Sequence, residues 1–210
     1  MKEVRRIVKL VISDADGTLL HRGKLIDERT FGRMLTALGT RSIPMVIASG
    51  RTYPELKSLF SPYENRLVFF ALDGAVAIAG GQRLCAFPLS LAAVADVLAL
   101  LSVSGIRGAE FCTRDTVYLY ARDEALAVSE EARLGDALRV LRYRADKEAS
   151  PLPGEATAIP DEPVYKIVIY KKRGAEPFLL PPGTRAVYDS PVVTELVRAD
   201  VSKRRAAEVV

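Results

Sequence analysis

Residues 10–20 read LVISDADGTLL, and the point where this apolar run ends decides the fold. The stretch VKLVIS (8–13) does not alternate between apolar and polar residues, which is typical of a parallel strand covered on both faces. It stops at Asp14 and Asp16, two carboxylates with one residue between them. Ligands collect at the carboxyl ends of the strands in open parallel sheets, so this junction is the first candidate site.

The chain then alternates between helix and strand patterns. Apolar residues recur at helical spacing over 27–39, and a short helix with an early proline is indicated over 52–60. Two more apolar strands are predicted at 43–49 and 66–72. The order strand-helix-strand-helix-strand predicts an α/β fold, in which a doubly wound parallel sheet has crossovers of the usual right hand.

The pattern changes after the third of these strands. Hairpins are predicted over 75–87, with a Gly-Gly turn, and over 109–121. The other predicted elements are helices over 90–105 and 123–142, a loop over 145–163, and strands over 164–172 and 184–190. Hairpins mixed with helices favour an antiparallel α+β module, inserted after the third parallel strand.

The composition is that of a globular protein. The chain has 210 residues, of which 49% are hydrophobic and 27% charged, and we find no apolar run long enough to span a membrane. The basic start leads into Asp14 rather than a cleavage site, so we expect a cytoplasmic protein with no membrane partner. Cys85 and Cys112 are expected to be reduced thiols. The net charge of +4 is scattered, which disfavours nucleic-acid binding.

Polar groups follow the next two predicted strands as well, with Ser49, Gly50 and Arg51 after the second and Asp73 after the third. Carboxylates as close as Asp14 and Asp16 repel each other unless a cation joins them, and Mg²⁺ prefers such oxygen ligands. The glycine that follows permits a tight turn whose amides can converge on an anion. These features predict a phosphoryl-transfer site with a metal, where one aspartate attacks phosphorus and the other handles the leaving-group proton.

At these residues the sequence resembles the Cof-type phosphatase branch of the haloacid dehalogenase superfamily. The segments that carry the resemblance are DADGTLL (14–20), IPMVIASGR (43–51), LDGAVAIAGG (72–81) and VVTELVRADVSKRRA (192–206). The resemblance implies a Rossmann-like core over 1–80 plus 185–210. It also implies a large inserted α+β cap over 81–184, which governs substrate specificity.

The resemblance also implies a role for each matching residue. Asp14 would be the nucleophile that forms an aspartyl-phosphate. Asp16 would protonate the leaving alcohol and then activate water. Mg²⁺ would be held by the Asp14 carboxylate and the Asp16 main-chain oxygen. Ser49 and Gly50 would bind the phosphoryl group, and Lys203 would neutralise charge on Asp14 and on the phosphoryl oxygens.

Two residues at the ends of the predicted strands have less defined roles. Asp73 stands where the branch usually has asparagine, and an added carboxylate repels phosphate unless it faces a metal, Arg51 or solvent. Arg51 is either a structural residue or a peripheral phosphate contact. Both are therefore candidate substrate contacts.

The fourth motif of the superfamily, Gly-Asp-x-x-x-Asp, does not follow Lys203 in this sequence. GDALR (135–139) lies in the expected cap and lacks the second aspartate. The core is therefore expected to be C-terminally incomplete, with VKLVIS as an edge strand. We expect weak or absent turnover from this chain. The chain would be truncated, or another chain would cover this edge; a homodimer is one hypothesis.

The function predicted from the sequence is a Mg²⁺-dependent phosphomonoester hydrolase that acts on small phosphorylated metabolites such as sugar phosphates. One alternative is a catalytically dead or truncated remnant that binds phosphate or a partner protein. Another is a phosphomutase, which would use the same aspartyl-phosphate chemistry and return the phosphoryl group to the substrate.

Overall fold

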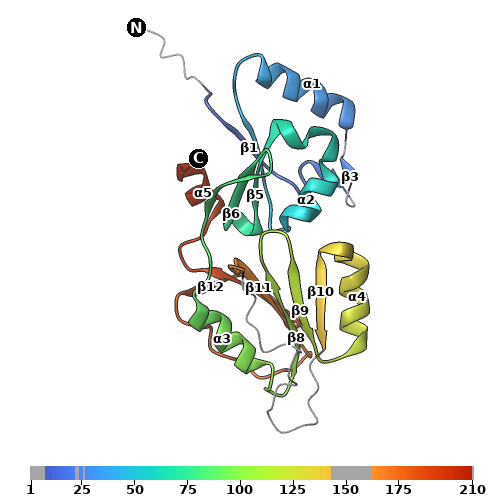
Figure 1. Cartoon of the computed structure of the whole chain (residues 1–210), viewed down its shortest axis with the longest axis vertical. Helices are drawn as coiled ribbons and strands as arrows, with labels where there is room; N and C mark the ends of the chain where they lie inside the picture. Colours follow the sequence, from blue (N-terminus) through green and yellow to red (C-terminus); the bar gives the residue numbers. More distant parts are fainter. Residues whose placement is uncertain (1–7, 22–23, 26, 143–161, 210) are drawn as a thin grey trace. The chain divides into compact units, whose positions relative to one another are not determined.

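The structure is a computed structural model that describes residues 8–21, 24–25, 27–142 and 162–209. Most of the predicted loop over 145–163 lies outside these residues. The chain forms two compact units (Figure 1). The first unit comprises Met1–Cys85 and Lys203–Val210, and the second comprises Ala86–Ser202.

The first unit is built on a five-stranded sheet in the order β1-β4-β5-β6-β7. These strands are β1 (Val11–Asp14), β4 (Met45–Ala48), β5 (Leu67–Ala71), β6 (Val76–Ala79) and β7 (Gln82–Ala86). The first three are parallel, and their register places Asp14 beside Ala48 and Ala48 beside Phe70. The carboxyl ends of three strands therefore share one edge, and the predicted α/β core is confirmed.

Both faces of this sheet are covered at β4 and β5, which explains why these two strands are apolar throughout, whereas β1 is only partly covered. On one face Val46, Ala48 and Phe70 pack with Ala206 of α5 (Lys203–Val209). On the other, an aromatic cluster links the sheet to its helices, with ring centroids 6.2 Å apart for Phe60 and Phe69. The helical elements on this face of the sheet are α1 (Glu28–Gly39), α2 (Tyr53–Leu59) and η1 (Ser61–Arg66). Burial on both sides fixes the edge where the polar residues emerge.

Strand β1 is the last strand on its side of this sheet in the described part of the chain. It pairs only with β4 there, and Ile12 is 43% exposed. The edge position predicted for this strand is thus observed. A short two-stranded ribbon, β2 (Leu20–His21) with β3 (Lys24–Leu25), follows the turn after β1.

The second unit contains a six-stranded sheet in the order β10-β9-β8-β11-β13-β12. Its strands are β8 (Ile106–Cys112), β9 (Val117–Ala121), β10 (Leu138–Arg142), β11 (Lys166–Lys171), β12 (Thr184–Asp189) and β13 (Val193–Arg198). Helix α3 (Leu91–Leu100) packs on the face that carries Phe111 and Ile169. Helix α4 (Glu124–Leu134) packs on the opposite face, where its Leu126 lies against Gly108.

Two expected boundaries differ from the structure. The helix predicted over 123–142 ends at Leu134, because Gly135 leaves helical geometry with φ of 52°, and strand β10 follows. Residues 185–202 were expected in the core, but β12 pairs with β13 and β13 pairs with β11, so they belong to the second unit. The first unit also continues past residue 80, because β7 extends its sheet.

No helix in the described ranges is both long and apolar enough to cross a membrane.

Candidate active site

The turn after β1 exposes two carboxylates and buries the residue between them. Asp14 and Asp16 are exposed, whereas Ala15 is fully buried. The main-chain oxygen of Ala15 accepts hydrogen bonds from the amides of Leu19 and Leu20 at 3.0 and 2.8 Å. Gly17 has φ of 74°, which favours glycine, and its amide donates to the oxygen of Leu20 at 3.0 Å. The backbone therefore fixes both aspartates at the edge where the parallel strands end, here called the rim.

Asp14 is paired with a lysine from the far end of the sequence. The Nζ of Lys203 donates to Asp14 Oδ1. Both side chains are partly open to solvent, at 41% for Lys203 and 44% for Asp14. Lys203 is the first residue of α5, which is anchored by the burial of Ala206 against the sheet. The packing of one short helix thus delivers a cation to the carboxylate at the end of β1.

Asp16 is held by the guanidinium of Arg51. Arg51 Nε lies 2.9 Å from Asp16 Oδ2, and Arg51 Nη2 lies 2.8 Å from Asp16 Oδ1, so the contact is bidentate. The hydrogen bonds from Arg51 lower the pKa of Asp16, with smaller effects from Ser49 and Lys203. Such planar, charge-assisted pairs fix orientation as well as charge. Asp16 is thus kept as an oriented carboxylate.

Ser49 lies just past the end of β4 and is only 2% exposed. Its amide extends the ladder by donating to the oxygen of Phe70 at 2.9 Å, and its hydroxyl accepts from the amide of Arg51 at 3.2 Å. The Ser49 side chain also hydrogen-bonds Asp16, so its hydroxyl is suited to donate to an anion at the rim.

Asp73 lies in the 3-10 turn η2 (Leu72–Gly74), which has an unusual backbone conformation. Leu72, Asp73 and Gly74 have φ of 52°, 61° and 90°. The turn is held because the amide of Leu72 donates to the oxygen of Arg51 and the amide of Asp73 donates to the oxygen of Ser49, both at 2.9 Å. Asparagine and aspartate both tolerate this left-handed conformation, so the backbone at position 73 accepts either.

The rim thus combines a lysine-paired carboxylate, a second carboxylate held by arginine, and a buried hydroxyl. The sequence profile of the haloacid dehalogenase-like hydrolases matches residues 11–209. The chain belongs to this family. It also resembles an Escherichia coli (strain K12) protein, the 5-amino-6-(5-phospho-D-ribitylamino)uracil phosphatase YbjI, with 31% identity over 91 residues. That match covers 43% of this chain and only 34% of the relative.

Several solved structures share the fold of this chain. SMU.1108c from Streptococcus mutans UA159 superposes with a TM-score of 0.73 at 20% identity, covering 96% of this chain and 74% of that one. The phosphatase BT1666 from Bacteroides thetaiotaomicron superposes with a TM-score of 0.68 at 17% identity, covering 97% of this chain and 71% of that one. At these identities the likeness concerns the fold.

For this haloacid dehalogenase-like hydrolase, the structure pairs Asp14 with Lys203 and joins Asp16 to Arg51. Gly50 lies between Ser49 and Arg51 at the end of β4. Arg51 contacts Asp16, a candidate catalytic residue, directly. The sequence left open whether Arg51 is structural or contacts phosphate. The roles given to these residues stay predictions.

Sequence reasoning missed Glu55. Its Oε1 lies 3.5 Å from Arg51 Nη1. The signal that could have found it is the spacing Thr52-x-x-Glu55 before a helix, which is typical of a capping box. The structure has this capping box at the start of α2.

Two groups at the rim are suited to bind a hard cation. They are the Asp14 carboxylate and the main-chain oxygen of Asp16. No group of three or more acidic, histidine or cysteine side chains that could hold a metal ion occurs among the residues that the structure describes. Mg²⁺ commonly uses one or two carboxylates and takes its other ligands from water and substrate phosphate. The donors present therefore fit Mg²⁺, and they do not fit an ion enclosed by protein alone.

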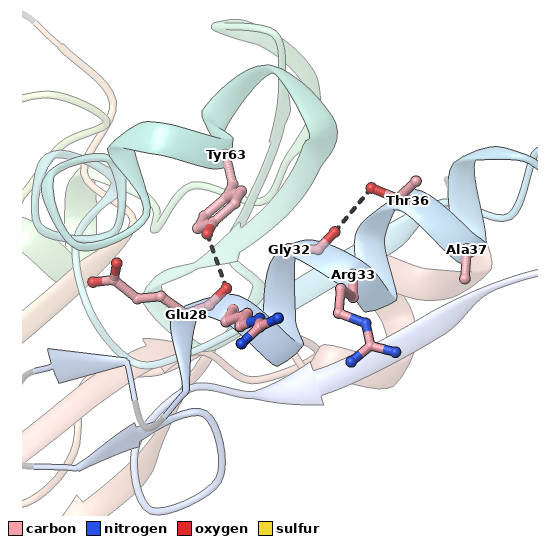
Figure 2. A pocket seen from close by; sticks show the side chains of 7 residues that line it. Glu28, Gly32, Arg33, Thr36, Ala37 and Tyr63 are labelled. Atoms are coloured by element: carbon pink, nitrogen blue, oxygen red, sulfur yellow. Dashed lines mark hydrogen bonds between the residues drawn. The ribbon is translucent and has the colours of Figure 1, made fainter.

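A shallow groove lies elsewhere on the first unit, along α1 and η1 (Figure 2). Tyr63 spans it and donates a hydrogen bond to the main-chain oxygen of Glu28 at 3.1 Å. The residues that line it are Glu28, Arg29, Gly32, Arg33, Thr36, Ala37 and Tyr63. None of them is a rim residue, so the groove is not part of the candidate active site.

The second unit contains a different group of charges. Glu110 on β8 is 1% exposed and accepts two hydrogen bonds from Arg133 Nη2, at 2.7 and 2.9 Å. Arg133 Nε also donates to Glu130 at 2.5 Å, and Tyr170 hydrogen-bonds Glu110. Burial raises the pKa of Glu110 to about 7, although Arg133 opposes this. A second pair, Lys166 with Glu195 at 2.6 Å, lies on β11 and β13.

Proposed function

We propose that this protein is a Mg²⁺-dependent phosphomonoester hydrolase that acts on small phosphorylated metabolites through an aspartyl-phosphate on Asp14. The observation that carries the proposal is the Asp14–Lys203 pair at the carboxyl end of a parallel strand. A partly exposed carboxylate beside a fixed cation is suited to approach a phosphate dianion, because the lysine offsets the repulsion between two anions. Membership of the haloacid dehalogenase-like hydrolases supports the same chemistry.

In the first step, a carboxylate oxygen of Asp14 attacks phosphorus, and the bond between phosphorus and the ester oxygen breaks. Asp16, in its protonated form, gives its proton to the departing oxygen, so the product leaves as an alcohol. Lys203 and the Ser49 hydroxyl interact with the phosphoryl oxygens, whose charge is spread in the transition state.

In the second step, water attacks the aspartyl-phosphate. Asp16, now a carboxylate, takes the proton from that water, and the bond between phosphorus and the Asp14 oxygen breaks. Inorganic phosphate leaves, and both aspartates return to their starting state. Arg51 lowers the pKa of Asp16, which favours the carboxylate needed in this second step and disfavours the protonated form needed in the first.

Mg²⁺ would be held by the Asp14 carboxylate and the Asp16 main-chain oxygen, and when bound it supplies charge neutralisation for the phosphoryl group. Lys203 holds Asp14 in place and shares this task. Both cations would reduce the repulsion between Asp14 and the incoming phosphate.

The substrate class is inferred from the relatives. One of them is described as a phosphatase of a phosphoribitylamino-uracil, and another solved structure is described as the sugar phosphatase BT4131. Both names support a small phosphorylated metabolite as the substrate. We further propose that the second unit, inserted between β7 and α5, acts as the cap that selects the leaving group.

The test is phosphate release from a panel of sugar phosphates and p-nitrophenyl phosphate, with and without Mg²⁺. We expect release that needs Mg²⁺ and that falls by about 10⁴-fold or more in Asp14→Asn, because the nucleophile is lost. Asp189→Asn is the matched control, since it removes an exposed carboxylate paired with Lys171 in the second unit. Release that survives in Asp14→Asn would rule out the proposed intermediate, and an isomerised sugar phosphate without free phosphate would indicate a mutase.

A further inference from the structure

Glu55 joins the start of α2 to the rim. Its Oε2 accepts from the amide and the hydroxyl of Thr52 at 3.0 and 2.8 Å, and the Thr52 hydroxyl accepts from the Glu55 amide at 3.4 Å. This reciprocal capping box fixes the Glu55 side chain, which is only 13% exposed. Its other oxygen, Oε1, is directed to Arg51.

Arg51 is held at both edges of its guanidinium. Nε and Nη2 bind Asp16, whereas Nη1 lies 3.5 Å from Glu55 Oε1. Its main chain is fixed as well, because its amide donates to Ser49 and its oxygen accepts from Leu72. An arginine side chain has much rotamer freedom to lose, so two carboxylates and a fixed backbone are needed to keep its fork in one orientation.

Asp16 depends on this support, because its side chain is 51% exposed and lies on a turn rather than on a strand or helix. A proton can be transferred only when donor and acceptor lie within hydrogen-bond reach in the correct orientation. We propose that Arg51 and Glu55 are positioning residues for the reaction: Arg51 orients the Asp16 carboxyl group, and Glu55 orients Arg51. This inference rests on the proposed function, in which Asp16 transfers the proton to and from the reacting oxygen.

The first test compares kcat/KM for two substrates with different leaving groups. An alkyl phosphate needs a proton on its leaving oxygen, whereas p-nitrophenyl phosphate releases a stable phenolate. We expect Arg51→Ala to lower kcat/KM by about 10²-fold for the alkyl phosphate and only a few-fold for p-nitrophenyl phosphate. Glu55→Gln should show the same selectivity, at about 5- to 10-fold for the alkyl phosphate. An equal loss on both substrates would overturn the proposal, since a general structural defect acts on both.

Two further variants sharpen this result. Arg51→Lys keeps the charge and loses the fork, so it should recover less than half of the lost activity. In an Asp16→Ala background, Arg51→Ala should lower kcat/KM by less than about 2-fold, because the proposal has Arg51 act through Asp16. Full additivity of the two changes would contradict the proposal. Lys57→Gln is the control on the same helix, because it removes an exposed contact with Glu64 at 3.4 Å that does not involve Arg51.

Crystal structures of the wild-type chain and Glu55→Ala test the geometry without any activity. We expect the bidentate Arg51–Asp16 contact in the wild type and its loss in the variant. A contact that persists in Glu55→Ala would overturn the role of Glu55. A wild-type chain that shows the contact yet releases no phosphate from either ester would refute the proposed function, and the catalytic part of this inference with it.

Discussion

The rim of the first unit and the sheet of the second unit both hold carboxylates beside cations, but they differ in burial. At the rim, the side chains of Asp14 and Lys203 are 44% and 41% exposed. In the second unit, Glu110 is 2% exposed beside Arg133 at 42%, and Lys166 is 5% exposed beside Glu195 at 28%. Both members of the rim pair are therefore open to solvent, whereas each pair of the second unit has one buried member.

This difference predicts which charges serve a ligand and which charges serve the fold. A buried ion pair loses its hydration, and only fixed partners compensate for that loss, so removing one partner is costly. An exposed pair contributes little to stability and can exchange its partner for a ligand. We therefore expect the rim pairs to control activity and the second unit's pairs to control stability.

The largest effect expected from this comparison is in Lys203→Met, set against Lys166→Met. Lys203→Met should lower kcat by about 10²- to 10³-fold, because a cation that neutralises the transition state is lost. It should change the free energy of unfolding by no more than about 1 kcal/mol. Lys166→Met should do the reverse, with a loss of about 2 kcal/mol in stability and a change in kcat of only a few-fold. Steady-state kinetics and denaturant unfolding of both variants measure the two quantities.

The Lys166 estimate is kept below that for a fully buried pair, because Glu195 retains 28% of its side-chain exposure and so keeps contact with water. A Lys203→Met chain that unfolds more easily than Lys166→Met would show that burial is not what divides the two groups of charges.

The next effect concerns pH and Glu110. Its pKa is raised to about 7 in the folded chain, above the ordinary value of 4.5, chiefly by burial. A raised carboxyl pKa means that this group contributes stability at low pH, and the contribution is lost as pH rises from about 4.5 through about 7. The loss is about 3 kcal/mol, measured as the free energy of unfolding at about pH 5 and about pH 8. Glu110→Gln cannot ionise and should flatten this dependence.

The groups that face Glu110 do not reverse the predicted fall in stability with rising pH. Arg133 and Glu130 face it from α4, and Tyr170 faces it from β11. The pKa values of Arg133 and Tyr170 are raised, so both keep their protons across this range. Carboxyl groups with lowered pKa, such as Asp16 and Asp123, lose their contribution only below their ordinary value of 3.8. A wild-type chain whose stability rises from pH 5 to pH 8 would show that Arg133 outweighs burial at Glu110.

The sequence predicted those parts of the fold that depend on local pattern. Unbroken apolar runs identified β1, β4 and β5, and the residues after them gave the rim. The same logic did not identify β10, because helix and strand patterns are hard to separate in the short stretch after Gly135. It also placed 185–202 in the wrong unit, since the choice of partner strand depends on contacts far along the chain.

The contacts of the site were harder to predict than its residues. Asp16 and Arg51 are 35 positions apart, and Asp14 and Lys203 are 189 apart. Sequence spacing carries no direct information about such pairs, so Asp14 and Lys203 could be joined only through a resemblance. Glu55 was missed because the spacing Thr52-x-x-Glu55 was not recognised as a capping box, and that spacing alone does not show that the second carboxylate oxygen faces Arg51.

The smallest effect concerns β1, which pairs only with β4 in the part of the chain that the structure describes. Unpaired edges invite pairing with a second chain, and a lysine on the edge opposes it. If two copies pair through β1, Ile12→Lys should shift the mass measured by light scattering from dimer to monomer. Ile12 is 43% exposed, so the change in stability should stay within about 0.5 kcal/mol. A wild-type chain that is monomeric at every concentration would contradict the homodimer hypothesis. The exposure of β1 would then have no function in assembly to set beside the proposed function of the exposed rim residues in catalysis.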